Sequence, residues 1–311
     1  MTILFTADWH IKLAQKNVPV PWALNRYHEF FKQVHAIKCD KHIIGGDLFD
    51  RIPSMEELEL YYEFILGVNV PTIIFDGNHE ATKKGVTFLK SLKKVTKALN
   101  PLVEIIDECY IDENEKFNIL PYCKLKASKA FDFLRYDWPL FTHVRGEIPP
   151  HVKAEIDLEL LSRFPIVYAG DLHSHSNCQR NIIYPGSPLT TTFHRSRVDT
   201  GYILIEEDWS WTWHPFKLPQ LIRKTVQDPG DMIATDYDHT VYELEGDLVD
   251  LANVKNSDLL DKKVIKRSTE TALILTPEMT ISEELAEYLL FILELDEDKV
   301  STIMGIFHDY T

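Results

Sequence analysis

The segment His42-Ile43-Ile44-Gly45-Gly46-Asp47 decides the fold class of this 311-residue chain. It begins as a short apolar run, which is typical of a strand buried on both faces, and it ends in two glycines and a carboxylate. Glycine allows a tight exit from a strand and a close approach of the backbone to a ligand. A strand that delivers a carboxylate at its C-terminal end indicates a layered α/β protein with a site at the strand ends.

The same pattern recurs along the first two thirds of the chain. Apolar strands that end at a polar side chain are predicted at residues 3–7, 42–46, 71–75, 139–142 and 165–169. Further strands are predicted at residues 102–106, 117–120, 181–184 and 201–205. Amphipathic helices are predicted at residues 22–37, 55–66 and 86–99. Because loops at strand C-termini converge on one crevice in such proteins, we expect the polar side chains to meet.

Five motifs at these strand ends carry the candidate metal ligands. They are Asp8-Trp9-His10, Gly46-Asp47, Gly77-Asn78-His79, the single His143, and Gly170-Asp171-Leu172-His173. Any one of these motifs can occur by chance, but side-chain packing does not explain all five in this order. Its mixture of carboxylate, amide oxygen and imidazole suits Mn, Fe, Zn or Mg, and not a thiolate site. The two oxygens of Asp47 could bridge a pair of ions, and His79 beside them is expected to handle protons.

Composition narrows the classes of function. The formal net charge is −15 and the sequence pI is about 5.3, so the chain is a poor non-specific binder of nucleic acid by itself. The four cysteines form no C-x-x-C pair and are expected to be reduced thiols. The N-terminus has no signal-peptide pattern, and no apolar run reaches the ~20 residues that span a bilayer. We therefore expect a cytoplasmic protein.

The pattern changes after about residue 220. Strands are predicted at residues 241–244 and 271–275, with a weak helix at 248–254. A helix opens at residues 280–284, with Thr280 or Ser282 as the N-cap, and runs to about 293, and a further helix is predicted at 296–307. The predicted domains are a catalytic domain at 1–220, a capping domain at 221–276 and a helical partner-docking segment at 277–311.

The ordered motifs resemble the calcineurin-like metallophosphoesterase superfamily. Within it, Gly46-Asp47-Leu48-Phe49-Asp50 and the later Ile182-Ile183-Tyr184-Pro185-Gly186-Ser187-Pro188 are similar to SbcD-type nuclease subunits of DNA repair. The similarity is greatest to the recombination exonuclease subunits of tailed bacteriophages. The resemblance covers about residues 1–210 and implies two central mixed β-sheets flanked by helices, with a small α/β cap domain and C-terminal helices.

The resemblance also implies roles for individual residues. One ion would be held by Asp8, His10, Asp47 and His173, and the other by Asp47, Asn78, His143 and Asp171. The ions would most often be Mn²⁺, with Mg²⁺ as the alternative, and His79 would protonate the leaving oxygen. One departure is that Asp171 stands where the family pattern G-H-x-H has its first histidine. We expect Asp171 to ligate a hard cation all the same; His175 is the alternative ligand if the loop bends.

The implied activity is exonuclease, with endonuclease activity also open, in DNA end processing, recombination or repair. The implied partners are DNA and an SbcC-type coiled-coil ATPase, in a heterotetramer that contains a homodimer of this chain, with no membrane. A phage-encoded chain would work in the cytoplasm of the host cell. The docking element would be the apolar stripe formed by Leu285, Tyr288, Leu289, Ile292 and Leu293, for which ordinary intramolecular packing is the competing interpretation.

Two other functions stay open at this point. A Ser/Thr protein phosphatase of the same superfamily shares part of both glycine-containing motifs. However, Ile52 stands where that class has a glycine, and Asp76 stands where it has a phosphate-binding arginine. The other alternative is a catalytically silent scaffold, and such proteins tend to lose ligands that this chain retains.

Overall fold

The computed structural model describes residues 1–81, 86–127, 129–265, 279–293 and 295–310. Within these ranges, none of the helices combines the length and the apolar character that crossing a bilayer requires. The chain forms two compact units, one of residues 1–244 with 255–262 and the other of residues 245–254 with 263–311. The three-domain division expected from the sequence stays a prediction, and its border at residue 276 lies outside the described residues.

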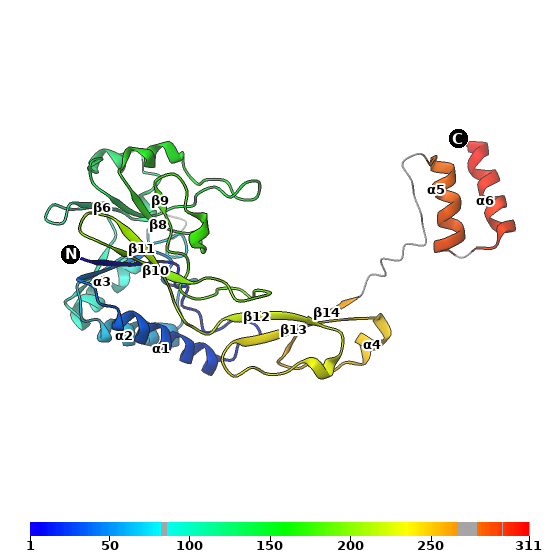
Figure 1. The fold of residues 1–311 in the computed structure, drawn as a ribbon, viewed down its shortest axis with the longest axis horizontal. Helices are drawn as coiled ribbons and strands as arrows, with labels where there is room; N and C mark the ends of the chain where they lie inside the picture. The colour runs from blue at the N-terminus through cyan, green and yellow to red at the C-terminus, as the bar shows by residue number, and fades with distance from the viewer. Residues whose placement is uncertain (82–85, 128, 266–278, 294, 311) are drawn as a thin grey trace. The chain divides into compact units, whose positions relative to one another are not determined.

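The first unit is built on two β-sheets (Figure 1). The larger sheet has the strand order β11-β10-β1-β2-β3-β4. Its strands are β1 (Ile3–Thr6), β2 (Lys41–Gly45), β3 (Thr72–Phe75), β4 (Val103–Ile106), β10 (Gly201–Ile205) and β11 (Trp211–Pro215). Strands β1 to β4 are parallel, whereas β10 is antiparallel to both β1 and β11. The parallel strands therefore end at one edge.

The second sheet has the strand order β5-β6-β7-β8-β9. Its strands are β5 (Tyr110–Asp112), β6 (Phe117–Leu120), β7 (Leu140–His143), β8 (Val167–Gly170) and β9 (Ile182–Ile183). Strands β6 to β9 are parallel, and β5 pairs antiparallel with β6. The predicted fold class, two mixed sheets with flanking helices, is confirmed.

Three helices cover the outer face of the larger sheet: α1 (Val20–Ala36), α2 (Met55–Gly67) and α3 (Leu89–Leu99). Helix α2 begins with a capping box in which the Ser54 and Glu57 side chains each bond the other residue's backbone N–H, as expected at a helix start. Helix α3 begins three residues later than predicted, because Thr87 forms a β-bridge with Ala81 instead of the first helical turn.

Aromatic side chains fill the space between the two sheets. Phe5 of β1 packs edge-on against Phe141 of β7 with ring centroids 5.4 Å apart, and Phe141 stacks on Tyr168 of β8 at 5.2 Å. All three are fully buried. Short 3₁₀ helices pack on the other face of the second sheet: η1 (Tyr122–Lys124), η2 (Phe131–Phe133) and η3 (Leu158–Arg163). This packing holds the strand ends of both sheets next to each other.

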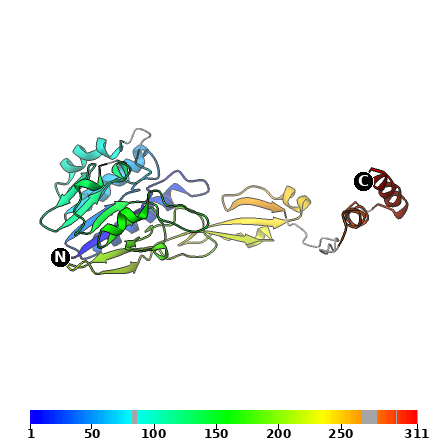
Figure 2. The same ribbon diagram turned by 90° about the horizontal axis from the view of Figure 1, so that it is seen from above.

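A third sheet has the order β12-β13-β14, and its strands lie side by side in both views (Figures 1 and 2). The strands are β12 (Leu221–Val226), β13 (His239–Gly246) and β14 (Leu260–Ile265), with 3₁₀ helix η5 (Pro229–Asp231) and helix α4 (Leu248–Asn253). The strand at 241–244 and the helix at 248–254 were predicted, whereas β12 and β14 were not. The strand predicted at 271–275 lies outside the described residues.

The C-terminal segment is helical, as predicted. Helix α5 (Ile281–Glu287) continues into a π-helical turn (Tyr288–Ile292) and is followed by α6 (Glu297–Tyr310). Thr280 is the N-cap of α5, and it forms a capping box with Glu283. Of the two N-caps that the sequence left open, the structure therefore has Thr280.

Candidate metal centre

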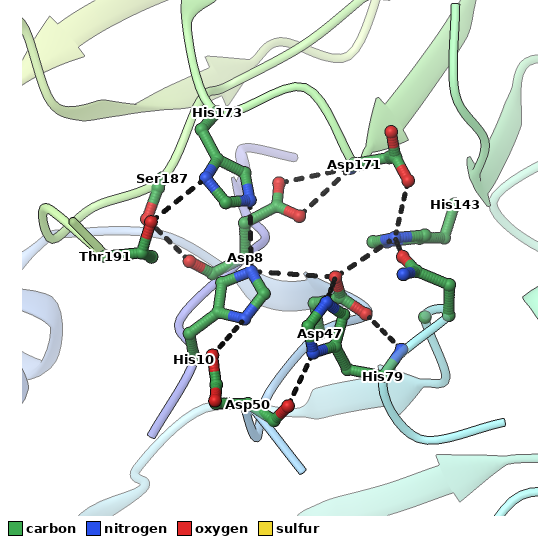
Figure 3. Close-up of polar contacts among 12 residues, drawn as sticks. Asp8, His10, Asp47, Asp50, His79, His143, Asp171, His173, Ser187 and Thr191 are labelled. Atoms are coloured by element: carbon green, nitrogen blue, oxygen red, sulfur yellow. Dashed lines mark hydrogen bonds and ion pairs between the residues drawn. The ribbon is translucent and has the colours of Figure 1, made fainter. Parts of the chain in front are cut away.

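The centre lies where the parallel strands of both sheets end (Figure 3). Asp8 follows β1, Asp47 follows β2 and Asn78 follows β3, all in the larger sheet. From the second sheet, His143 is the last residue of β7, and Asp171 directly follows β8. The His143 ring crosses between the sheets, because its Nδ1 lies 2.9 Å from the carbonyl oxygen of Gly45. The side chains that the sequence expected to meet do meet here.

The backbone at this centre is held in an uncommon conformation. Four non-glycine residues of the centre have positive φ angles: Asp8 (58°), His10 (45°), Asp47 (51°) and Asp171 (102°). Such a conformation costs about 1–3 kcal/mol per residue and persists only where the surroundings enforce it. Here the amide of Asp8 donates to the Gly46 carbonyl at 3.0 Å, and that of His10 donates to the Asp47 carbonyl at 2.9 Å. The loops after β1 and β2 thus fix each other.

Glycine at position 77 is a steric requirement of the centre. A Cβ atom added to Gly77 would lie 2.2 Å from Oδ1 of Asp47 and 2.4 Å from its backbone nitrogen. Both distances are far below van der Waals contact. The Gly77-Asn78-His79 turn therefore packs directly on the Asp47 carboxylate, and no larger residue fits there.

One group of side chains that could hold a metal ion consists of Asp8, His10 and His173. The Nε2 atoms of His10 and His173 face each other at 3.1 Å, and His10 Nε2 lies 3.6 Å from Oδ2 of Asp47. At this distance the two Nε2 atoms have room for at most one proton between them. Burial, followed by the nearby His10, lowers the pKa of His173 to about 4, so its ring is neutral and can act as a ligand near neutral pH.

A second group centres on Asp47 and His143. His143 Nε2 lies 3.5 Å from Asp47 Oδ2 and 3.8 Å from Asp171 Oδ1. The inward end of the Asn78 carboxamide lies 2.9 Å from His143 Nε2, 3.1 Å from Asp47 Oδ2 and 3.2 Å from Asp171 Oδ1. With the amide oxygen inward, three oxygen acceptors and His143 Nε2 face one another, an arrangement that a cation stabilises.

The charges of the centre depend strongly on one another. Burial, reinforced by the carboxylates of Asp47 and Asp171, raises the pKa of Asp8 to about 8. The pKa of Asp47 lies well below its usual range, because the imidazoles of His143 and His10 outweigh the effect of burial. The pKa of His143 is raised in turn, since the nearby carboxylate of Asp47 outweighs its burial. A bound cation would take the place of protons in this cluster.

The His79 side chain is 36% exposed, and with His10 and Asp47 it forms a further group that could hold a metal ion. Its Nδ1 lies 2.5 Å from the Asp50 carbonyl oxygen, which fixes the ring, and its Nε2 lies 3.9 Å from Asp47 Oδ2. A ring that donates from Nδ1 to a carbonyl leaves Nε2 available to exchange a proton with a bound molecule. The role of general acid expected for His79 from the sequence stays a prediction.

Three supporting residues were not assigned these roles from the sequence. The buried Glu80 carboxylate accepts hydrogen bonds from the amides of Asp47 (2.9 Å), Gly77 (2.8 Å) and Phe49 (2.8 Å). Asp50 faces His10 Nδ1 at 3.6 Å, and Ser187 Oγ lies 2.6 Å from the Asp8 carbonyl oxygen. Glu80 and Asp50 belong to the motifs Gly77-Asn78-His79-Glu80 and Gly46-Asp47-Leu48-Phe49-Asp50, so their proximity to the ligands was visible in the sequence.

Two other residues considered in the sequence analysis lie elsewhere. His175 Nδ1 is 2.7 Å from the Tyr184 carbonyl oxygen, and the ring stacks on Trp213, so it is in none of the metal-binding groups among the described residues. Asp76 is fully buried, and its Oδ2 accepts from the amide of Cys123 at 3.2 Å. Its side chain is therefore held in the interior and offers no positive charge to a phosphate.

Comparison with known proteins assigns the class. The family model described as calcineurin-like phosphoesterase matches residues 1–163, and the chain belongs to this family of hydrolases. The chain is similar along nearly its whole length to the "Probable exonuclease subunit 1" of Escherichia phage T5. The two are 40% identical over 323 residues, which cover 98% of this chain and 97% of that protein.

Among solved structures, TT1561 of Thermus thermophilus matches this chain with a TM-score of 0.43 and 10% identity over 69% of this chain and 98% of that one. The nuclease MPE of Pseudomonas putida matches with a TM-score of 0.29 and 17% identity, over 55% of this chain and 61% of that one. Divalent metal ions are what this family uses, and the carboxylate, amide and imidazole groups of the centre fit them.

Proposed function

We propose that the chain is the nuclease subunit of a DNA-processing complex and hydrolyses phosphodiester bonds with two divalent ions, preferably Mn²⁺. The observation that carries the proposal is the position of Asp47. Its Oδ2 lies 3.6 Å from His10 on one side and 3.5 Å from His143 on the other. A carboxylate between two groups of ligands is what a bridged pair of ions requires. The T5 relative, named an exonuclease subunit, supports DNA as the substrate.

The proposed ligands divide between the two ions. One would be held by Asp8, His10, Asp47 and His173, and the other by Asp47, Asn78, His143 and Asp171. The ions would supply a hydroxide near neutral pH and stabilise negative charge on the phosphate. The protein side chains fix this arrangement: Glu80 holds the amides of the Asp47 loop, and Asp50 faces the outer nitrogen of His10.

His79 is the proposed general acid. It is half-exposed, so a substrate can reach it, and the hydrogen bond to Asp50 orients the ring toward the centre. A protonated Nε2 would give its proton to the departing oxygen of the cleaved strand. General acid catalysis of this kind typically contributes about 10²–10⁴ in rate.

A partner subunit follows from the charge of the chain and from its C-terminal helices. At a net charge of −15, DNA binding requires positive charge from another source. In the predicted docking stripe, Leu289 is buried, whereas Tyr288, Ile292 and Leu293 are 42–50% exposed. These apolar side chains are available for a partner, and we propose an SbcC-type coiled-coil ATPase, in a heterotetramer with two copies of this chain in the host cytoplasm.

One experiment separates this function from the alternatives. Purified protein is given Mn²⁺ with end-labelled duplex DNA, single-stranded DNA and a phosphomonoester, with Asp8→Ala as the control. Digestion of DNA that the control loses supports the nuclease. Hydrolysis of the monoester alone would indicate a phosphatase, and no hydrolysis, even with the ATPase added, would indicate a scaffold.

A further inference from the structure

The Asp171 side chain is only 6% exposed and lies among other acidic groups. Its backbone amide donates to Asp8, and its Oδ1 faces His143 Nε2 at 3.8 Å. Asp8, Asp47 and Asp171 thus place three carboxylates in one buried centre (Figure 3). Buried charges of one sign repel strongly unless a partner of opposite charge is close.

Arg145 supplies that partner. Its Nε lies 3.2 Å from Asp171 Oδ2 and its Nη2 lies 3.5 Å from Oδ1, so the guanidinium approaches both oxygens. Among the residues that the structure describes, it is the one lysine or arginine paired with these three carboxylates. Its side chain remains 44% exposed, so packing of the core does not account for its position.

The family pattern has a neutral imidazole where this chain has Asp171. Three carboxylates with one guanidinium carry the same net charge as two carboxylates with a neutral imidazole. The chain therefore keeps the charge of the centre although the ligand has changed. Because Arg145 follows His143 by two residues, the end of β7 brings both side chains to Asp171.

We propose that Arg145 is a positioning residue of the metal centre, which fixes the Asp171 carboxylate and cancels its charge so that the pair acts as one neutral ligand. The proposal rests on the proposed two-metal function and deepens it. Arg145 touches neither the substrate nor the ions in this role. It acts through Asp171, whose carboxylate then meets a cation in a fixed orientation.

The test measures Mn²⁺ binding to the full-length chain by calorimetry, without DNA. Asp171→Asn removes the charge but leaves Arg145 uncompensated beside the centre, and we expect the affinity of the second ion to fall at least about 10-fold. Adding Arg145→Gln to that variant removes the positive charge that had lost its partner. If the pair is a unit, this second substitution raises the affinity again by about 10-fold.

An arginine that acts only through its own charge gives a different pattern. In that case, Arg145→Gln would raise the affinity by the same factor with Asp171 present as in the Asp171→Asn background, and equal factors would overturn the proposal. Arg180→Gln is the matched control, because Arg180 is equally exposed (43%) and pairs with Glu159 away from the centre. It should leave Mn²⁺ binding unchanged.

Two further measurements keep the result interpretable. Thermal unfolding in EDTA shows whether each variant folds, and Asp171→His, with and without Arg145→Gln, serves as a second background with the same expected sign. DNA digestion by the wild type is measured separately. Two bound ions without digestion would remove the proposed nuclease function and leave the inference standing, whereas a wild type that binds no Mn²⁺ would overturn both.

Discussion

The backbone amide of Asp171 donates to both carboxylate oxygens of Asp8, at 3.0 and 3.2 Å, across 163 residues of chain. Asp8 follows β1 of the larger sheet and Asp171 follows β8 of the second sheet. This contact joins the two sheets at the point where their strands end. It also fixes the Asp8 carboxylate through a backbone amide, and among the described residues no lysine or arginine forms an ion pair with that carboxylate.

The first prediction concerns Asp47. Asp47→Asn should release both ions, because one residue lies between the His10 and the His143 sides of the centre. The measurement is the Mn²⁺ content per chain after dialysis against a fixed concentration of free metal. Asp112→Asn is the control, since Asp112 is similarly buried but pairs with Lys41 away from the centre. Two ions retained with undiminished affinity would contradict the bridging role.

The second prediction concerns His79. His79→Ala should lower the rate of DNA cleavage by about 10²–10⁴-fold while the bound metal stays the same, since the ring serves as an acid and not as a ligand. Single-turnover cleavage and Mn²⁺ content, measured on the same preparation, separate the two roles. His28→Ala changes a surface histidine of α1 and should keep full activity. Unchanged cleavage in the His79 variant would exclude the proposed acid.

The parts of the fold that could be predicted are those in which one strand carries its own signal. Strands β1, β2, β3, β7 and β8 are apolar runs that end at a polar residue, so both the strand and its site residue are visible locally. Strands β11 and β12 were missed. No residue of β11 is fully buried, and β12 contains Arg223 and Lys224, so neither shows the pattern of a buried strand.

The candidate site follows the same division. The ligand candidates could be named because each belongs to a short motif at a strand end. The supporting contacts could not be named from the sequence, because they join residues far apart in the chain. Glu80 reaches Asp47 across 33 residues and Arg145 reaches Asp171 across 26, and no local pattern indicates which backbone amide or carboxylate will lie opposite.

The third prediction concerns Glu80. Glu80→Gln replaces one carboxylate oxygen by an NH₂ group. Backbone N–H groups that donated to that oxygen would then face another donor and lose their acceptor. Leaving a buried donor unpaired costs about 1–3 kcal/mol, so the free energy of unfolding should fall by that amount. Because these amides belong to the loops of Asp47 and Gly77, Mn²⁺ affinity should fall about 10–100-fold as well.

Urea unfolding in EDTA and Mn²⁺ calorimetry measure the two effects of Glu80→Gln independently. Glu63→Gln is the matched control, because Glu63 lies on α2 with its side chain 60% exposed. A variant of Glu80 with the stability and metal affinity of the wild type would show that its carboxylate does not organise the centre.

The last prediction concerns His42, which is buried in β2 away from the metal ligands. Burial, followed by the nearby His35, lowers the pKa of His42 to about 3. Its Nε2 lies 2.9 Å from Thr6 Oγ1, which accepts a hydrogen bond from Trp9 Nε1 at 3.0 Å, so the hydroxyl proton can point to a neutral imidazole. Protonation of Nε2 would break this chain of bonds.

The sign of the pH dependence follows from the direction of that shift. Below the ordinary pKa of histidine, about 6.5, the unfolded chain gains a proton that folded His42 does not accept, so stability is lost as the pH falls from about 6.5 toward 3. The loss from this one group approaches about 1.4 kcal/mol per pH unit. His42→Gln removes this pH dependence. When the pH is lowered from 6 to 5, the free energy of unfolding of the wild type should therefore fall relative to that of the variant by close to that amount. Urea unfolding in EDTA, followed by tryptophan fluorescence, measures the difference. A difference that stays constant over this range would show that His42 takes up its proton equally in both states.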